Sequence, residues 1–258
     1  MIRNRYLKLA FIFIFLFAGL SLAAETVKKA PTQLFYSGNN FYEKRDYLKA
    51  LEEYVKIIDM KLESGNLYYN VGNSFFKLGK LGYAILSYEK ARKFMPQDSD
   101  LKSNLAYARS LTAAAAFTAS RNPICKVINA PFAEFNINAI AISGAVFYLI
   151  LALILTLFIL NPFAARKFRF ALIVFVILFL LNLSAFAVRY YETEILKYGI
   201  VLQKNTECRY EPIDVSTTYY KLQAGDEVLI LKTRNGWRQI TRIDGKIGWV
   251  KKNSVGEI

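Results

Sequence analysis

The side chains that most often carry catalysis are scarce in this sequence. Its 258 residues include two Cys and no His, which is both the commonest general base and a leading metal ligand in proteins. The chain also lacks a nucleophile elbow, a P-loop and paired carboxylates in a cleft-like context. We therefore expect a binding protein rather than an enzyme, with no metal and no cofactor.

The formal net charge is +14, and half of this excess flanks hydrophobic segments, where Lys and Arg set the orientation of membrane proteins. The remaining segments carry no dense basic stripe of the kind that neutralises phosphates. Nucleic acid is therefore not expected as a partner. The 20 Phe and 17 Tyr also exclude a disordered chain.

Three hydrophobic segments predict how the chain meets a membrane. Leu9–Leu20 follows three cations and is typical of a signal peptide, assigned to residues 1–24, with an uncleaved anchor as the alternative. Residues 139–160 and 170–188 carry no charge and are long enough to span a bilayer. The basic stretch 161–169 between them is predicted to be a cytoplasmic loop, which places both soluble parts outside.

Residues recur at a spacing of 34 along the first soluble part. The aligned pairs are Leu34 with Tyr68, Gly38 with Gly72, Phe41 with Phe75, Ala50 with Ala84, and Tyr54 with Tyr88. This period is typical of stacked helix–turn–helix units, in which small residues let helices approach and aromatic residues fill the space beside them. Pro96 predicts the end of the second unit.

Residues 65–98 resemble a tetratricopeptide (TPR) repeat. The matching positions are Tyr68, Val71, Gly72, Phe75, Ala84, Tyr88, Ala91 and Pro96. Residues 31–64 resemble the repeat at fewer positions, and residues 99–118 resemble its capping helix. The resemblance implies a short all-α TPR solenoid over residues 31–118, followed by a linker over residues 119–138.

The TPR resemblance also implies a binding face, because the first helix of each unit lines a groove that takes peptides. The residues at these positions are Phe35, Asn39, Tyr42, Tyr69, Asn70, Asn73, Phe76 and Tyr107. Asn could bond a peptide backbone, and the aromatic rings could bury its side chains. Phe35 stands where some relatives place a carboxylate-clamping Lys, so no clamp is expected. The alternative is that the Asn residues serve packing and solubility.

Residues 196–258 consist of short apolar runs separated by turns. Asn235-Gly236 and Asp244-Gly245 are strong hairpin signals. The segment resembles the bacterial SH3-like (SH3b) module, and we expect a small all-β barrel without open edges. The matching positions are Leu222, Gly225, Val228, Gly236, Trp237, Gly245, Gly248, Trp249 and Val250.

Relatives of this module bind cell-wall peptides or proteins, which makes Tyr219, Trp237 and Trp249 candidate ligand-binding residues. The favoured alternative is that both tryptophans belong to the barrel core. Cys208 stands at a position that is usually apolar, which indicates burial, and a disulfide with Cys125 remains open.

The complete order is a signal peptide, TPR units, two transmembrane helices and an SH3b-like domain. It resembles BatE-like members of the Bacteroides aerotolerance (Bat) family and implies a multidomain protein, first α and then β. The resemblance implies a location in a bacterial inner membrane, with both soluble domains periplasmic. It also implies partners of the Bat type, several of which carry von Willebrand A domains.

Two functions are expected, one implied by the Bat resemblance and the other by the SH3b resemblance. The first is a non-enzymatic scaffold that presents both modules to the periplasm within a complex for aerotolerance or envelope stress. The alternative is a peptidoglycan-binding sensor or organiser of the envelope that acts through the SH3b domain.

Overall fold

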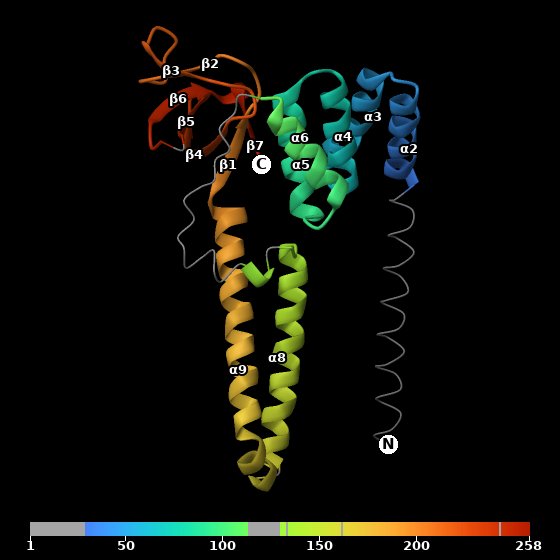
Figure 1. The fold of residues 1–258 in the computed structure, drawn as a ribbon, viewed down its shortest axis with the longest axis vertical. Coiled ribbons are helices and arrows are strands. Elements are labelled where there is room, and N and C mark those ends of the chain that lie inside the picture. The colour runs from blue at the N-terminus through green and yellow to red at the C-terminus, as the bar shows by residue number, and fades with distance from the viewer. Residues whose placement is uncertain (1–28, 113–129, 133, 161, 243) are drawn as a thin grey trace, which may run out of the picture.

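The structure is a computed structural model. It describes residues 29–112, 130–132, 134–160, 162–242 and 244–258. The expected signal peptide, most of the expected linker and Cys125 lie outside the described residues. Figure 1 shows two long helices side by side, with a stack of shorter helices and a β-sheet both placed at the same end of this pair.

Five helices form what we call the helical stack. They are α2 (Lys29–Glu43), α3 (Tyr47–Asp59), α4 (Gly65–Lys77), α5 (Leu81–Phe94) and α6 (Ser99–Ser110). Helices α2 and α3 form one antiparallel hairpin and α4 and α5 a second, and α6 packs on α5. Buried apolar residues between them, including Tyr54, Val71 and Leu101, form the cores of the stack.

Local signals in the sequence set the ends of these helices. The side chains of Asp46, Ser64 and Asp98 accept hydrogen bonds from backbone N–H groups in the first turns of α3, α4 and α6, as N-caps do. At the other ends, Arg45, Lys61 and Gly79 adopt positive φ angles after α2, α3 and α4. The paired backbone bonds around these three residues are those of the Schellman motif.

The 34-residue spacing corresponds to one helical hairpin. Gly38 lies against the ring of Tyr54, and Gly72 against the ring of Tyr88 in the same way. A Cβ atom at Gly72 would lie 2.5 Å from the ring of Tyr88, so the close approach of α4 and α5 requires the absence of a side chain there.

The two long helices are α8 (Ile137–Leu160) and α9 (Pro162–Tyr190). Each contains a candidate membrane span, Ile137–Phe158 in α8 with a mean hydropathy of 2.6 and Phe168–Tyr190 in α9 with a mean hydropathy of 2.8. The amide of Asn182 donates a hydrogen bond of 2.8 Å to the Ser143 hydroxyl on the facing helix, which is the packing contact expected for a polar residue in a span. Helix α9 begins at Pro162, so residues expected in the loop 161–169 extend this helix.

Seven antiparallel strands follow α9. They are β1 (Lys197–Val201), β2 (Thr206–Arg209), β3 (Thr218–Leu222), β4 (Glu227–Arg234), β5 (Trp237–Thr241), β6 (Ile247–Lys251) and β7 (Val255–Glu257). The Asn-Gly and Asp-Gly pairs join β4 to β5 and β5 to β6, which confirms both hairpins. The sheet order is β3-β2-β6-β5-β4-β1-β7. The expected barrel without edges is therefore wrong, because within the described part of the sheet β3 and β7 do not pair with each other and are edge strands.

The sheet and the helical stack pack on each other through α5. Ile200 of β1 lies in the same buried cluster as Ile85 of α5. A Cβ atom at Gly82 would lie 2.5 Å from the backbone oxygen of Leu202, so the first turn of α5 meets the chain beyond β1 at backbone distance. The Lys93 ammonium donates to the Ile258 backbone oxygen over 3.0 Å. The extramembrane parts therefore form one packed body.

A continuous backbone path joins this body to the membrane helices. Helix α9 ends at Tyr190, a single π-helical turn (Tyr191–Ile195) follows, and β1 begins at Lys197. Strand β1 pairs with β4 on one side and β7 on the other. The coarse prediction of α-helices followed by β-structure, with two candidate spans, is confirmed. No TPR solenoid is identified among the helices that the structure describes.

Candidate ligand-binding face

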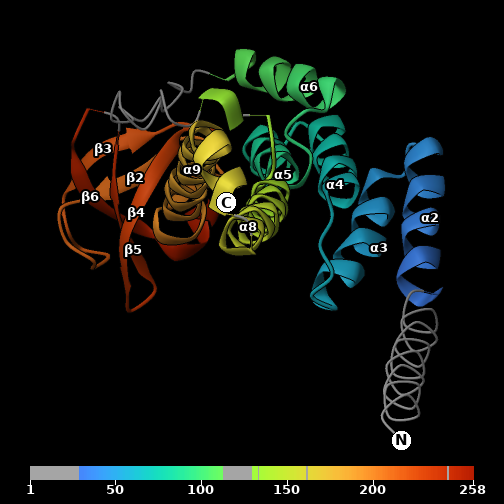
Figure 2. The ribbon, with the colours of Figure 1, turned by 90° about the horizontal axis from the view of Figure 1, so that it is seen from below.

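The eight residues expected in a groove lie on α2, α4 and α6, and we call their common surface the three-helix face. Helix α2 carries Phe35, Asn39 and Tyr42, helix α4 carries Tyr69, Asn70, Asn73 and Phe76, and helix α6 carries Tyr107. Figure 2 shows the first helices of the hairpins following one another across the stack. Side-chain contacts between α2 and α4 and between α4 and α6 join these residues into one surface.

Asn39 is the centre of a first hydrogen-bonded group. Its Oδ1 atom accepts from the Tyr54 hydroxyl over 2.7 Å and from the Asn70 amide over 2.9 Å. The group therefore ties α2 to both its own partner helix α3 and the next first helix α4.

Asn73 repeats this arrangement one unit later. Its Oδ1 atom accepts from the Tyr88 hydroxyl over 2.8 Å and from the Asn104 amide over 3.3 Å. The Asn104 amide also donates to the Tyr69 hydroxyl over 2.8 Å. Asn104 was missing from the predicted face, although the period would have found it, since it follows Asn70 by 34 residues.

Burial fixes the two tyrosines of these groups as proton donors. It raises the pKa of Tyr54 to about 12 and also raises the pKa of Tyr88, because a buried phenolate is poorly solvated. Both hydroxyls therefore remain protonated and hold the Oδ1 atoms of Asn39 and Asn73 at physiological pH.

These bonds show that the packing role of the Asn residues is real, yet they leave part of each amide pair unused. Within the described ranges, the Nδ2 atoms of Asn39 and Asn73 and the Oδ1 atoms of Asn70 and Asn104 form no hydrogen bond. All four side chains are partly exposed. Each group thus offers one donor and one acceptor, the combination that a peptide unit can satisfy.

Aromatic side chains lie beside the polar groups of the three-helix face. The ring of Phe35 lies 6.0 Å from that of Tyr54, and the ring of Phe76 lies 5.7 Å from that of Tyr107. Tyr107 is 58% exposed. The face therefore combines polar pairs with apolar area available for burial.

The three candidates on the sheet are not brought together. Trp237 on β5 and Trp249 on β6 are each 8% exposed, which fits the alternative of a core role. Tyr219 instead packs against Tyr210, with ring centres 4.4 Å apart and ring planes tilted by 31°. Among the described aromatic residues, no ring contact joins Tyr219 to either tryptophan. Cys208 is buried and unpaired, and burial raises the pKa of its thiol.

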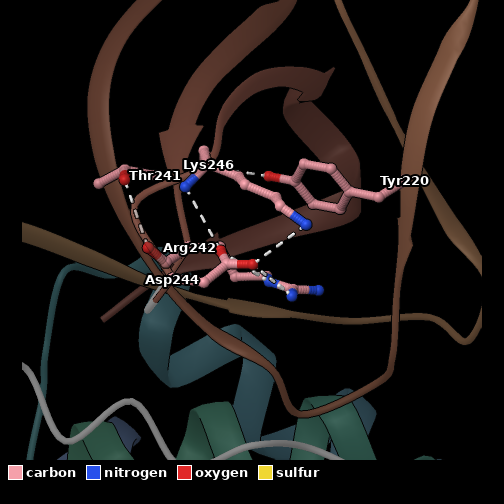
Figure 3. A network of polar contacts seen from close by, with 5 residues as sticks. All are labelled: Tyr220, Thr241, Arg242, Asp244 and Lys246. Carbon is pink, nitrogen blue, oxygen red and sulfur yellow. Dashed lines mark hydrogen bonds and ion pairs between the residues drawn. The ribbon is translucent and has the colours of Figure 1, made fainter.

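Figure 3 shows a polar network of the sheet at the turn between β5 and β6. Arg242 donates two hydrogen bonds to the Asp244 carboxylate, over 3.1 Å and 2.6 Å. These bonds hold the pKa of Asp244 down at about 2. The Tyr220 hydroxyl donates to the Lys246 backbone oxygen over 3.3 Å. Since the carboxylate is already paired, the network stabilises a turn and offers no reactive group.

A second charged cluster lies between the stack and the sheet. Arg109 of α6 contacts Glu89 of α5 at 2.6 Å and Glu227 of β4 at 3.0 Å. Burial raises the pKa of Glu227, and the nearby Glu89 charge raises it further. The cluster joins three elements and is a structural contact. In the described parts of the chain, no group of three or more Cys, Asp or Glu side chains could hold a metal ion.

Among known families, the model of the serpentine type 7TM GPCR chemoreceptor Srw family matches residues 132–243. The matched region contains α8, α9 and the strands from β1 to β5, which is less than half of the chain. The helical stack lies outside it. Two helices in the described residues could span a membrane, against the seven in the name of the family. No curated protein matches the chain.

This match contradicts the expected Bat identity, because the family found is a receptor family and not a TPR and SH3b protein. The periplasmic scaffold, the peptidoglycan-binding alternative and the bacterial inner membrane are overturned with it. Bat-type von Willebrand A partners are likewise unsupported. The expectation that the chain is not an enzyme is confirmed, since the matched family consists of receptors. The match and the two spans agree on a membrane-integral protein.

Proposed function

We propose that the chain is a membrane-integral, receptor-type binding protein whose ligand is an extended peptide segment held on the three-helix face. In this proposal the five helices act as a short solenoid of stacked hairpins, and the sheet supports the last hairpin. No chemical step is required of any residue, because the work of the face is recognition.

The observation that carries the proposal is the repeated amide pair. The pair of Asn39 and Asn70 and the pair of Asn73 and Asn104 repeat the same amide-to-amide hydrogen bond 34 residues apart, and in each pair the accepting oxygen also takes a tyrosine hydroxyl. Each pair leaves one donor and one acceptor unused. An extended peptide has donors and acceptors at regular spacing and side chains on alternate sides, which would reach the aromatic residues of the face.

The test is a binding selection on the full chain in detergent micelles, with a display library of unstructured dodecapeptides as the probe. The informative variant is Asn73→Asp. It keeps an oxygen for the Tyr88 and Asn104 bonds and replaces only the unused amide nitrogen. We expect selected peptides to bind this variant at least tenfold more weakly than the parent, in line with the loss of a hydrogen bond that leaves a partner unsatisfied.

The matched control is Asn40→Ala, since Asn40 is exposed and directly follows Asn39 on α2. This variant should bind the selected peptides as the parent does. Equal binding to Asn73→Asp, or a selection that enriches no peptide on the parent, would overturn the proposal.

A further inference from the structure

We infer that the end of the helical stack nearest α8 rests on the bilayer that the spans cross, and that apolar side chains of two turns enter its headgroup layer. The two turns are residues 60–64, between α3 and α4, and residues 94–98, between α5 and α6. We call them the basal turns. The inference concerns a lipid contact and does not depend on the peptide ligand.

The first step fixes the level of the membrane surface. Helix α8 begins at Ile137, two residues after Phe135, which is 45% exposed, and α9 ends at Tyr190, which is 48% exposed. The Arg189 guanidinium donates to the Phe135 backbone oxygen over 3.4 Å, so the two ends lie side by side. Tyrosine is enriched at the membrane–water interface, so Tyr190 marks the level of the membrane surface at this end of the helix pair.

The second step places the basal turns at this level. The Asn136 amide, one residue before α8, donates to the Phe94 backbone oxygen over 3.3 Å. A second contact joins the chain before α8 to α6, since the Lys102 ammonium lies 2.5 Å from the Glu134 carboxylate. The turn between α5 and α6 therefore lies against the start of the span, as Figure 1 also shows.

The other basal turn lies next to the first. A Cβ atom at Gly65, the first residue of α4, would lie 2.7 Å from the Met95 side chain and 3.3 Å from Phe94. The rings of Tyr68 and Phe94 stack with centres 6.2 Å apart. The two turns thus form one continuous surface at the same end of the stack.

Large apolar side chains are exposed on this surface among the polar residues of the two turns. Met60 is 48% exposed, Leu62 is 39% exposed and Phe94 is 40% exposed. Lys61 lies between the first two with a positive φ of 60°, so it closes α3 without a glycine. Leu62 also lines a shallow pocket with Pro31 of α2. Apolar side chains next to a cation suit the boundary between acyl chains and headgroups.

The test compares two single tryptophan variants of the full chain, reconstituted into vesicles of phosphatidylcholine with brominated or unbrominated acyl chains. In Leu62→Trp the new side chain lies in a basal turn. The matched control is Leu48→Trp, since Leu48 is 58% exposed and lies in the first turn of α3, roughly 16 Å along the axis from the last residue of that helix, where the basal turn begins. Trp237 and Trp249 are present in both variants and in the parent, whose signal is subtracted.

We expect bromine to quench the added emission of Leu62→Trp at least twofold and to leave that of Leu48→Trp unchanged. Equal quenching in the two variants would overturn the inference. So would emission from Leu62→Trp that depends on protein concentration and not on bromine, since this result would assign the surface to a second copy of the chain.

Discussion

At the scale of single residues, the helical stack contains positions where the presence or absence of a Cβ atom affects stability. Gly72 meets the ring of Tyr88 so closely that a methyl group has no room, and Arg45 and Lys61 adopt a backbone conformation that side chains disfavour. These two situations predict changes of stability in opposite directions.

Replacement of Gly72 by Ala should destabilise the protein by roughly 1–3 kcal/mol, the usual cost of forcing extra volume into a packed interior. The thermal unfolding midpoint of the full chain in detergent measures the effect. Gly79→Asn is the control, because nothing lies within 4 Å of a Cβ atom at Gly79 and Asn tolerates its positive φ. An unfolding midpoint for Gly72→Ala that is no lower than that of the control would contradict the close packing of Gly72 on Tyr88.

Replacement of Arg45 by Gly should stabilise the protein by up to about 1 kcal/mol, because a residue with a Cβ atom is strained at a φ of 63°. At the equivalent position one repeat later, the chain has Gly79, which adopts a positive φ of 71° without a Cβ atom. The unfolding midpoint should rise for Arg45→Gly and fall for Arg45→Val. A fall for both variants would show that the side chain of Arg45 matters more than its backbone.

How far the sequence predicts the candidate face is also decided residue by residue. The period aligned Gly38, Gly72, Tyr54 and Tyr88 correctly, because repeated packing leaves a repeated pattern of residue types. The same pattern could not show that Asn39 and Asn73 are held through their oxygen atoms. This detail depends on hydrogen bonds between residues 31 positions apart, and one such partner, Asn104, was overlooked.

At the scale of elements, α5, α6 and the sheet are joined by ion pairs that could not be predicted from the sequence. Arg109 and Glu227 are separated by 118 residues, and nothing in the local sequence of either relates it to the other. The hairpins of the sheet were predictable, because the Asn-Gly and Asp-Gly turns act locally. The open order of the sheet was not, because the edges depend on which distant strands pair.

This charged contact predicts a dependence on pH. The pKa of Glu227 is raised above 4.5 by burial and by Glu89, so the folded chain binds this proton more tightly than the unfolded chain does. Its contribution to stability is therefore complete below about pH 4.5 and is lost as the pH rises through the folded pKa. Glu227→Gln removes this loss while Arg109 keeps its contact with Glu89.

The unfolding midpoint of Glu227→Gln, measured relative to the parent, should therefore rise between pH 4.5 and pH 7. The control is Asp244→Asn, because the pKa of Asp244 is lowered to about 2 and its titration lies below this interval. A difference between Glu227→Gln and the parent that stays constant, or falls with pH, would contradict the assigned direction.

At the scale of the whole molecule, the stack and the sheet behave as one body because α5 meets the end of β1 at backbone distance. Gly82→Val should separate the two parts, since the new side chain would overlap the Leu202 backbone. Spin labels at Tyr107→Cys and Val215→Cys, in a Cys125→Ser background with buried Cys208 left in place, report the distance between the parts.

The distance distribution should be narrow with Gly82 present and should broaden or lengthen in Gly82→Val. Ser110→Val, an exposed change in the last turn of α6, serves as the control and should leave the distribution unchanged. An unaltered distribution in Gly82→Val would show that the parts are held together by other contacts.

The passage of α9 into β1 through a single π-helical turn has a mechanical consequence. A span tilts to match its apolar length to the thickness of the bilayer, and no loop separates α9 from the strand to absorb the change in angle. Because β1 is bonded on both sides within the sheet and packs on α5, a change of tilt is a change in the angle at which the three-helix face meets its surroundings. The thickness of the membrane would therefore help to set the orientation of the three-helix face.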